Sequence, residues 1–277
     1  MPESEVVRVA AVSDVHYNKS SHGMLQPLFT EIAQRADVLV IPGDLTDYGL
    51  ADEARVLARD LAGLKIPILA VLGNHDYESD QVDDIREILT SAGVQMLDGD
   101  SVEIQGIGFA GVRGFAGGFG RGALGAWGEA PIKAFVKEAL DEALKLEAAL
   151  ARLTTEQRIV LMHYAPIRDT VVGEPLEIFP WLGSSRLEEP ITRLGATAVV
   201  HGHAHKGFPE GRTSTGIPVY NVALAVLKEH FPNQSTYRLL EIPRAPATEV
   251  VGGASDRRQA GRRASDRAAT PGAIPPG

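Results

Sequence analysis

In the N-terminal part of the chain, the pattern of apolar and polar residues predicts short buried strands that alternate with amphipathic helices. Apolar, β-branched runs predict the strands, and apolar residues at helical spacing predict the helices between them. Because a helix after each strand carries the chain back across the sheet, this rhythm predicts parallel strands. The strands are predicted at residues 7–13, 38–41 and 66–72, and the helices at 24–35, 51–64 and 81–92.

The pattern changes in the middle of the chain. Short apolar segments separated by Gly and Asp predict strands in a more antiparallel arrangement, and hence a second sheet. Residues 130–153 place apolar positions at helical spacing among Lys and Glu, which predicts a long amphipathic helix. The short strands are predicted at residues 94–97, 101–105 and 107–112, and later strands around Ile159, Val199, Val219 and Tyr237.

Residues 244–277 differ in composition from the rest of the chain. They contain six arginines, three acidic residues and no aromatic residue, so they predict a disordered Arg/Pro/Gly-rich tail. The chain is therefore divided into one domain at 1–243 and a tail at 244–277. The tail carries a net charge of +3 and the whole chain −9, which leaves about −12 on the domain. An acidic domain repels nucleic-acid backbones, so nucleic acid is not an expected partner.

The cysteine count and the lengths of the apolar runs indicate the cellular compartment of the protein. The chain of 277 residues contains no cysteine, which excludes disulfides, thiolate ligands and thiol nucleophiles. The sequence opens without a charged and then apolar leader, and no apolar run approaches the length of a bilayer span. We expect a cytoplasmic protein with one α/β core and no membrane partner, and the sequence leaves the oligomeric state open.

Five short polar motifs each follow an apolar run, where a predicted strand ends. Side chains at the ends of neighbouring strands can converge on one point. Residues two apart lie on the same side of an extended strand, and two of the motifs contain such a pair. The motifs are Asp14-Val15-His16, Gly43-Asp44, Gly73-Asn74-His75-Asp76, the single residue His163, and Gly202-His203-Ala204-His205.

The side chains of these motifs suit a metal site. Imidazole, carboxylate and amide oxygen together favour borderline metals such as Mn, Fe and Zn, whereas oxygen ligands alone would favour Mg or Ca. Seven candidate ligands are too many for one tetrahedral site, but with one bridging carboxylate they divide into two half-open sites. The candidate ligands are Asp14, His16, Asp44, Asn74, His163, His203 and His205.

The ordered motifs resemble those of the calcineurin-like metallophosphoesterase superfamily, whose pattern is D-x-H, G-D, G-N-H-D/E, H and G-H-x-H. The resemblance extends over about residues 7–222 and implies an α/β fold, a four-layer α/β/β/α sandwich of two mixed β-sheets flanked by helices. It implies two metal ions that share Asp44 as a bridge. One ion would take Asp14, His16, Asp44 and His205, and the other Asp44, Asn74, His163 and His203.

The resemblance also implies catalytic roles. His75 matches the histidine that contacts the substrate and helps the leaving oxygen depart, and Asp47 matches the acid that orients it. Asn74 would contact the substrate as well as the metal. The implied reaction is hydrolysis of a small phosphodiester or phosphomonoester by a hydroxide that bridges the two ions. A metal-binding scaffold of the same fold without turnover is the alternative, although scaffold members typically lose ligands or the catalytic histidine.

Two segments narrow the substrate class. The residues Gly43-Asp44-Leu45-Thr46-Asp47 and the Gly-Asn-His-Asp block are similar to those of bacterial class III cyclic nucleotide phosphodiesterases. The protein Ser/Thr phosphatases of the superfamily carry an arginine where this chain has Tyr48. A phosphodiesterase acting on a small substrate, including a nucleotide, is therefore favoured over a protein phosphatase.

The remaining polar residues and the glycine-rich stretch give weaker indications of function than the five motifs. The glycine-rich stretch 111–128 predicts a mobile loop that covers the site, with Arg113 contacting phosphate, or else a flexible surface connection. Asp76 could support either His75 or its loop. His201 is interpreted as a core histidine in preference to a support for a metal ligand.

Overall fold

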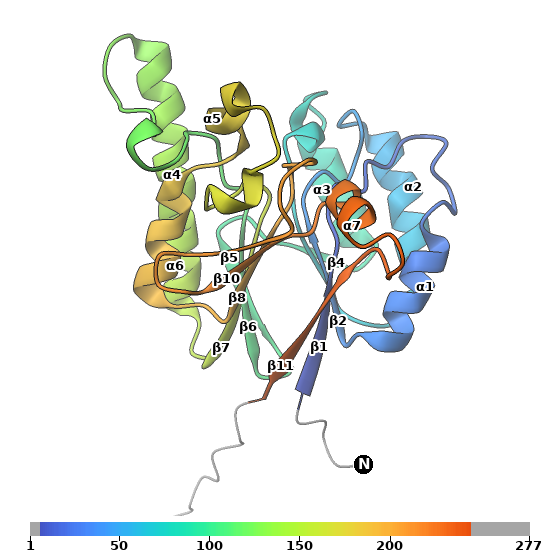
Figure 1. Cartoon of the computed structure of the whole chain (residues 1–277). Coiled ribbons are helices and arrows are strands. Elements are labelled where there is room, and N and C mark those ends of the chain that lie inside the picture. The colour runs from blue at the N-terminus through green and yellow to red at the C-terminus, as the bar shows by residue number, and fades with distance from the viewer. Residues whose placement is uncertain (1–5, 245–277) are drawn as a thin grey trace, which may run out of the picture. The chain divides into compact units, whose positions relative to one another are not determined.

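Two β-sheets pack face to face, and helices cover the outer face of each (Figure 1). This computed structural model describes residues 6–244. The predicted four-layer α/β/β/α sandwich of two mixed sheets is confirmed. The predicted tail at 244–277 lies outside the described residues, except for Arg244.

The first sheet has the strand order β11-β1-β2-β3-β4. β1, β2, β3 and β4 pair in parallel, as the alternation of strands and helices predicts, and β11 pairs antiparallel to β1. The expectation of an antiparallel arrangement from residue 94 onward is wrong for β4, because α3 returns the chain across the sheet before this strand begins. The strands are β1 (Val6–Ala11), β2 (Val38–Pro42), β3 (Ile68–Val71), β4 (Val94–Met96) and β11 (Arg238–Pro243).

The second sheet has the order β5-β6-β7-β8-β10-β9, which confirms the predicted second sheet. The hairpin β5–β6 is antiparallel, as expected, whereas β6, β7, β8 and β10 run parallel to one another. The edge strand β9 is antiparallel to β10. The strands are β5 (Asp100–Ile104), β6 (Ile107–Val112), β7 (Gln157–Met162), β8 (Ala198–His201), β9 (Glu210–Arg212) and β10 (Pro218–Asn221).

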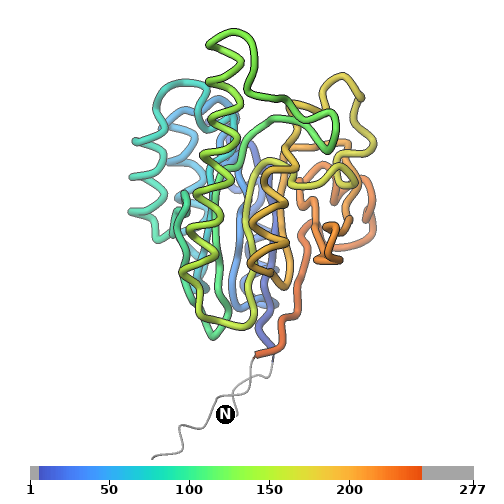
Figure 2. Tube along the Cα trace, turned by 90° about the vertical axis from the view of Figure 1, so that its left-hand side faces the viewer, coloured from blue at the N-terminus to red at the C-terminus, as the bar shows by residue number. Residues whose placement is uncertain are grey.

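Three helices, α1, α2 and α3, cover the first sheet, and α4 and α6 lie side by side over the second (Figures 1 and 2). The α-helices are α1 (Gln26–Arg35), α2 (Ala51–Leu61), α3 (Val82–Ser91), α4 (Ala130–Arg152), α5 (Phe179–Leu182), α6 (Glu188–Leu194) and α7 (Leu224–His230). Short 3-10 helices are η1 (His75–Tyr77), η2 (Gly120–Gly122), η3 (Asp169–Val171), η4 (Leu176–Ile178) and η5 (Ser185–Leu187). Among residues 6–244, no helix combines the length and the apolar character needed to cross a bilayer.

Strand alternation explains how the layers are held together. In the second sheet, Phe109, Leu161 and Val200 face the first sheet and join the main core. Their neighbours Val160 and Val199 belong to a second core with residues of α4 and α6. Because apolar side chains pack on both faces of the second sheet, this sheet is held in a fixed position between the first sheet and the helices α4 and α6. Loops that follow β1, β2, β3, β7 and β8 therefore meet at one edge of the sandwich, the upper edge in Figure 1.

Candidate metal centre

The seven predicted ligand residues all lie in loops that directly follow strands. Six of them place donor atoms in two groups, and within each group these atoms lie within 4.8 Å of one another. Asp44 belongs to both groups. The first group is Asp14, His16, Asp44 and His205, and the second is Asp44, His163 and His203. A third group of the same kind combines His16 with Asp47 and His75. Asn74 adjoins the second group, because its Oδ1 lies 2.9 Å from His163 Nε2.

Asp44 directs its two carboxylate oxygens toward different groups. Oδ2 lies 3.7 Å from His16 Nε2, and Oδ1 lies 3.4 Å from His163 Nε2. Oδ1 also accepts a hydrogen bond from the backbone N–H of His75 at 3.0 Å. The side chain is 1% exposed, so the carboxylate is fixed between the two groups and shielded from water.

Asp14 is the centre of the first group. Its carboxylate accepts hydrogen bonds from the Ser13 hydroxyl at 2.5 Å and from the backbone N–H of His203 at 3.0 Å. His205 Nε2 lies 2.9 Å from Asp14 Oδ1 and 3.4 Å from His16 Nε2. Two imidazole nitrogens and one carboxylate oxygen thus point at a common position.

In the second group, backbone carbonyls set the histidine tautomers. The Nδ1–H of His163 donates to the carbonyl of Pro42 at 3.1 Å, so Nε2 carries the lone pair that faces Asn74 and Asp44. His203 Nε2 lies 3.2 Å from the carbonyl of Trp181, and a bond to this acceptor leaves the lone pair on Nδ1. Each ring therefore presents one nitrogen that can bind a metal.

The local backbone differs from the extended strands that the sequence predicted. β1 ends at Ala11 and β8 at His201, before the ligand residues begin. Asp14, His16 and His203 have φ values of 56°, 42° and 70°, and Asp44 has 48°. Such left-handed conformations cost roughly 1–3 kcal/mol each and concentrate at functional sites. Turns, and not the alternation of a strand, bring these side chains together.

Three motif glycines are required because their own backbone lies directly against the side chain of a candidate metal ligand. A Cβ on Gly73 would lie 2.1 Å from Asp44 Oδ1, and a Cβ on Gly202 would lie 2.1 Å from Asp14 Oδ2. A Cβ on Gly43 would lie 2.5 Å from His163 Nδ1. The glycines of the motifs therefore leave space for the ligand side chains.

The electrostatics fit bound cations. Burial raises the pKa of Asp44 well above its usual value, and the charges of Asp14 and Asp76 raise it further. Burial alone would also raise the pKa of Asp14, but the hydrogen bond with His205 and the charges of nearby histidines lower it. Burial lowers the pKa of His163, which keeps this ring neutral and able to bind a metal. Two buried carboxylates, four imidazoles and one amide oxygen thus form a donor set that transition-metal ions would stabilise.

His75 and Asp47 lie beside the first group, but their contact differs from the expected one. His75 Nδ1 donates to the backbone carbonyl of Asp47 at 2.7 Å. The Asp47 carboxylate instead faces His16, with 3.5 Å between Oδ1 and Nδ1. The group of Asp47 that bonds His75 is therefore its backbone carbonyl and not its carboxylate. The His75 ring packs edge-on against His16 at 4.6 Å between centroids, and its side chain is 32% exposed.

Asp76 supports the loops, which resolves the alternative that the sequence leaves open. Its buried carboxylate accepts hydrogen bonds from the backbone N–H groups of Leu45, Thr46 and Gly73 at 3.2, 2.9 and 2.8 Å. The Thr46 hydroxyl adds a bond of 2.6 Å. Asp76 thereby fastens the Gly43-Asp44 loop to the Gly73-Asn74 loop.

Two other predicted residues lie apart from the donor groups. His201 is a buried core histidine between the Gly202 carbonyl and the Thr170 hydroxyl, both at 2.8 Å, and burial lowers its pKa to about 4. The guanidinium of Arg113 pairs with Glu138 at 2.5 Å and stacks on the ring of Tyr77. This engaged side chain gives no support to the predicted phosphate contact of Arg113.

The structure adds two residues to the site that the motifs do not include. The ring of Tyr164 packs against the rings of His163 and His203, at 5.4 and 4.6 Å between centroids. Tyr164 could have been found as the neighbour of His163 in the sequence. The carbonyl of Trp181 contacts His203 from a segment that carries no sequence signal.

The paired sheets carry at one edge a cluster of polar loops whose side chains could hold metal ions. Residues 7–207 match the family of calcineurin-like phosphoesterases, and the chain belongs to this family. This confirms the resemblance drawn from the motifs. The sequence matches no curated protein.

Solved structures share the fold at low identity. The phosphopantetheinyl hydrolase from Mycobacterium tuberculosis superposes with a TM-score of 0.62 at 17% identity, over 85% of this chain and 96% of that one. The protein TT1561 of Thermus thermophilus superposes with a TM-score of 0.50 at 16% identity, over 80% of this chain and 91% of that one. At these identities the likeness demonstrates the fold alone.

Proposed function

We propose that this chain hydrolyses phosphate esters of a small substrate at a centre of two metal ions. The observation that carries the proposal is the position of Asp44, whose buried carboxylate is shared by both donor groups. Mn and Fe suit this set of imidazoles and carboxylates best, and Zn is compatible with it. When bound, such ions supply a nucleophilic water at neutral pH and neutralise the charge of the phosphate.

The residues divide into ligands and a proton donor. One ion would be held by Asp14, His16, Asp44 and His205, and the other by Asp44, Asn74, His163 and His203. His75 is proposed as the general acid. Its Nδ1–H donates to the Asp47 carbonyl, so the doubly protonated ring would carry the transferable proton on Nε2 and donate it to the departing oxygen. Asn74 and His75 would also contact the phosphate.

A phosphodiesterase is proposed in preference to a protein phosphatase. The position where the superfamily's protein phosphatases carry an arginine is Tyr48, whose side chain is 58% exposed. Its backbone is engaged, because the N–H donates to Glu53 at 2.9 Å and the carbonyl accepts from Ser79 at 2.6 Å. This loop therefore presents no guanidinium to a phosphate. A cyclic nucleotide is the finer proposal for the substrate.

A metal-binding scaffold without turnover is the second candidate. Retention of a partly exposed His75 beside the donor groups favours the enzyme, because a scaffold has no use for a positioned proton donor.

The test combines metal content with turnover. The full chain is loaded with Mn, and its activity is measured on bis(4-nitrophenyl) phosphate and 4-nitrophenyl phosphate. We expect two ions per chain and metal-dependent turnover, and we expect Asp44→Ala to lose both ions because no carboxylate then separates two cations in a buried site. Asp84→Ala, an exposed acid on α3, is the control and should behave as wild type.

Two results would overturn parts of the proposal. Two bound ions with no turnover of either ester would establish the scaffold. At most one ion under saturating Mn, or two tightly held ions in Asp44→Ala, would exclude a bridging carboxylate.

A further inference from the structure

The glycine-rich segment, here called the Gly loop (residues 113–129), is fastened to a second irregular segment that precedes α6. The N–H of Gly117 donates to the carbonyl of Pro180 at 2.7 Å, and the N–H of Gly118 to that of Gly183 at 2.8 Å. In return, the N–H of Ser185 donates to the carbonyl of Gly118 at 3.1 Å. These bonds join two segments that are far apart in the sequence.

The backbone conformation of this loop requires glycine at several positions. Gly118 and Gly120 have φ values of 84° and 55°, which favour glycine. A Cβ on Gly117 would lie 3.0 Å from Ser184 Oγ, so close approach also limits this position. The N–H of Gly120 donates to the Ser185 hydroxyl at 2.7 Å. The mobile loop expected from composition is thus a hydrogen-bonded structure.

The two segments enclose a surface groove, here called the arginine groove. It consists of two adjoining hollows of about 470 and 310 Å³ that share Phe119, Gly122 and Arg168. Apolar surface in the groove comes from the partly buried ring of Phe119 and from Leu176, which is 66% exposed, whereas Phe179 is 8% exposed and lies under Arg168. Three arginines line it from separate parts of the chain: Arg121 in the Gly loop, Arg168 before η3, and Arg212 at the end of β9.

The guanidinium groups of the arginine groove are free to bind an anion. Within residues 6–244, no carboxylate forms an ion pair with Arg121, Arg168 or Arg212. Arg168 lies over the ring of Phe179 at 5.6 Å, and Arg212 donates to the carbonyl of Gly216 at 2.8 Å. The groove is also lined by two acids, Asp169 and Glu188.

The positive charges exceed the negative ones in the arginine groove. Of the two acids, Glu188 is engaged, because its carboxylate accepts the backbone N–H of Ser214 at 2.6 Å. The whole chain has a net charge of −9, so the excess of positive charge in the arginine groove is opposite in sign to the net charge of the protein.

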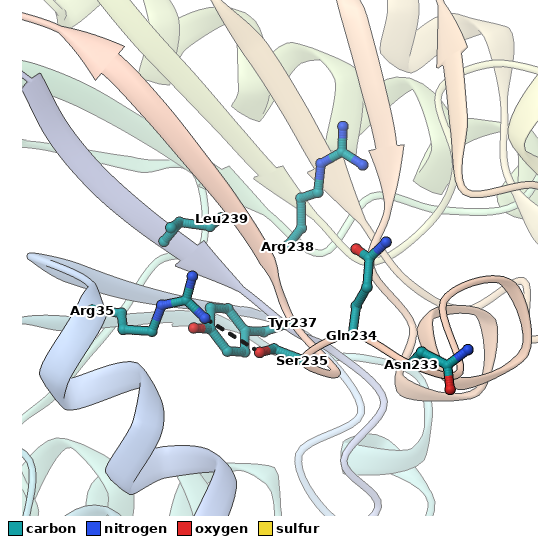
Figure 3. Close-up of a pocket in the computed structure, with 7 residues that line it drawn as sticks. All are labelled: Arg35, Asn233, Gln234, Ser235, Tyr237, Arg238 and Leu239. Atoms are coloured by element: carbon teal, nitrogen blue, oxygen red, sulfur yellow. Dashed lines mark hydrogen bonds between the residues drawn. The ribbon is translucent and has the colours of Figure 1, made fainter.

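A second cavity provides a contrast. This cavity of about 570 Å³ lies beside α1 and the start of β11 (Figure 3). Its two arginines are already paired: Arg35 with Glu31 at 2.9 Å and Arg238 with Glu210 at 2.5 Å. Arg35 also reaches Ser235, as the dashed line in Figure 3 marks. Paired guanidinium groups of this kind offer little to an incoming anion.

The arginine groove borders the candidate metal centre. Phe179 and Pro180 line the groove, and the next residue, Trp181, has its carbonyl 3.2 Å from His203 Nε2. Arg168 likewise lines the groove two residues before Thr170, whose hydroxyl bonds the buried His201. The same segment therefore forms the wall of the groove and touches the metal-binding loop.

We propose that the arginine groove binds a phosphoryl group carried on an apolar or aromatic body. Guanidinium groups recognise phosphate through paired N–H donors, and the apolar side chains of Phe119 and Leu176 suit the attached body. The two hollows lie within the range of roughly 300–1,000 Å³ that is usual for small-molecule sites. The phosphoryl group can come from the far end of the substrate, a case that rests on the proposed function, or from a separate phosphorylated ligand.

Titration calorimetry with phenylphosphonate tests the site, because the carbon–phosphorus bond of this probe resists hydrolysis. On Mn-loaded full chain we expect two binding events, one at the metal centre and one in the groove. Arg168→Gln and Arg121→Gln should each weaken one event roughly tenfold or more, as expected for loss of a charged hydrogen bond, with unchanged melting temperature. Arg55→Gln, an exposed arginine on α2, is the matched control.

A single binding event in wild type, or two events of unchanged affinity in both groove variants, would overturn the proposal. This readout needs no turnover, so an inactive protein would refute the proposed function and leave the groove to be decided by calorimetry.

Kinetics separate the two sources of the phosphoryl group. Adenosine 3′,5′-cyclic monophosphate and its 2′-phosphorylated derivative differ by one phosphate and form a matched pair of phosphodiester substrates. If the groove holds the far end of the substrate, Arg168→Gln raises KM for the 2′-phosphorylated cyclic nucleotide at least about tenfold and leaves KM for the unmodified cyclic nucleotide unchanged. If both KM values stay constant while the second phosphonate event is lost, the groove serves a separate phosphorylated ligand.

Discussion

At Asp44, one buried carboxylate faces imidazoles that come from both sheets of the sandwich. His16 follows a strand of the first sheet and His163 a strand of the second, so the contacts of Asp44 depend on how the sheets meet. His75, by contrast, lies at the exposed side and contacts Asp44 only through its backbone N–H. We therefore expect ligand and proton-donor substitutions to give different phenotypes.

We predict that His75→Ala retains both metal ions and loses roughly 10²- to 10⁴-fold in turnover, as expected for removal of a general acid. The deficit should shrink for a nitrophenyl ester, whose leaving group needs little proton donation, and grow for an alkyl ester. Rates on both esters and elemental analysis check this, with His230→Ala, on α7, as the control. Equal deficits for the two esters would instead assign His75 to phosphate binding, and loss of metal would place it among the ligands.

The second prediction at this scale concerns Gly73. We expect Gly73→Ala to lose metal and about 1–3 kcal/mol of unfolding free energy, because the added Cβ would lie 2.1 Å from Asp44 Oδ1 and 2.3 Å from its backbone N. Gly63→Ala is the matched control. It has no atom within 4 Å of the added Cβ and should change stability by less than about 1 kcal/mol. Metal content and urea denaturation of both variants decide the matter, and full metal content in Gly73→Ala would show that the loop can adjust.

At the scale of elements, α4 links the outer core of the second sheet to the loops at its edge. Its apolar face, with Leu146 and Leu150, packs in that core. The same helix buries Glu142, whose carboxylate accepts the backbone N–H of Gly114 at 2.8 Å and pairs with Lys145 at 2.7 Å. The helix thus fixes the start of the Gly loop as well as covering the sheet.

We predict that Leu146→Ala destabilises the protein by about 2–5 kcal/mol, because Leu146 is fully buried and its loss leaves a cavity in the packing of α4. Leu144→Ala, two positions earlier on the same helix, should change stability by no more than about 0.5 kcal/mol, because Leu144 is 61% exposed. Chemical denaturation measures both. Similar losses in the two variants would contradict the assigned face of the helix.

At the scale of the whole molecule, two histidines, His163 and His201, are fully buried where the two sheets and their loops meet, and burial opposes their protonation. His201 is the clearest case, because it is fully buried and both ring nitrogens have hydrogen-bond partners. Its pKa is about 4 in the folded chain against 6.5 for the free side chain. Between these values the unfolded chain binds a proton that the folded chain does not.

We predict that His201 contributes a loss of stability as pH decreases from about 6.5 to about 4, and that His201→Asn removes this contribution. Between pH 7 and pH 5, the wild type should lose about 2 kcal/mol more than the variant, since each unit of pKa difference corresponds to about 1.4 kcal/mol. Urea denaturation with a chelator present, at both pH values, tests this without a contribution from metal release. Identical slopes for the two proteins would mean that His201 does not remain neutral on folding.

The sequence alone determined the elements and the chemical character of the site. Runs such as 38–41 and the helical spacing of 130–153 reflect which residues are buried, so β2 and α4 were predicted near their observed bounds. The motif residues were also identifiable, because metal binding restricts the choice of side chains to a few types. The α/β/β/α fold came from the resemblance that these residues carry.

The tertiary structure decided which atoms meet. The carbonyl of Asp47 orients His75, Arg113 is committed to Glu138, and the glycine-rich segment is fixed by bonds to residues 180–185. None of these contacts follows from local pattern, because each joins segments brought together only by the packing of loops and layers. For the same reason the arginine groove, built by residues 121, 168 and 212, has no signature in the sequence. Local burial preferences fix elements, whereas pairing between distant segments depends on the closed fold.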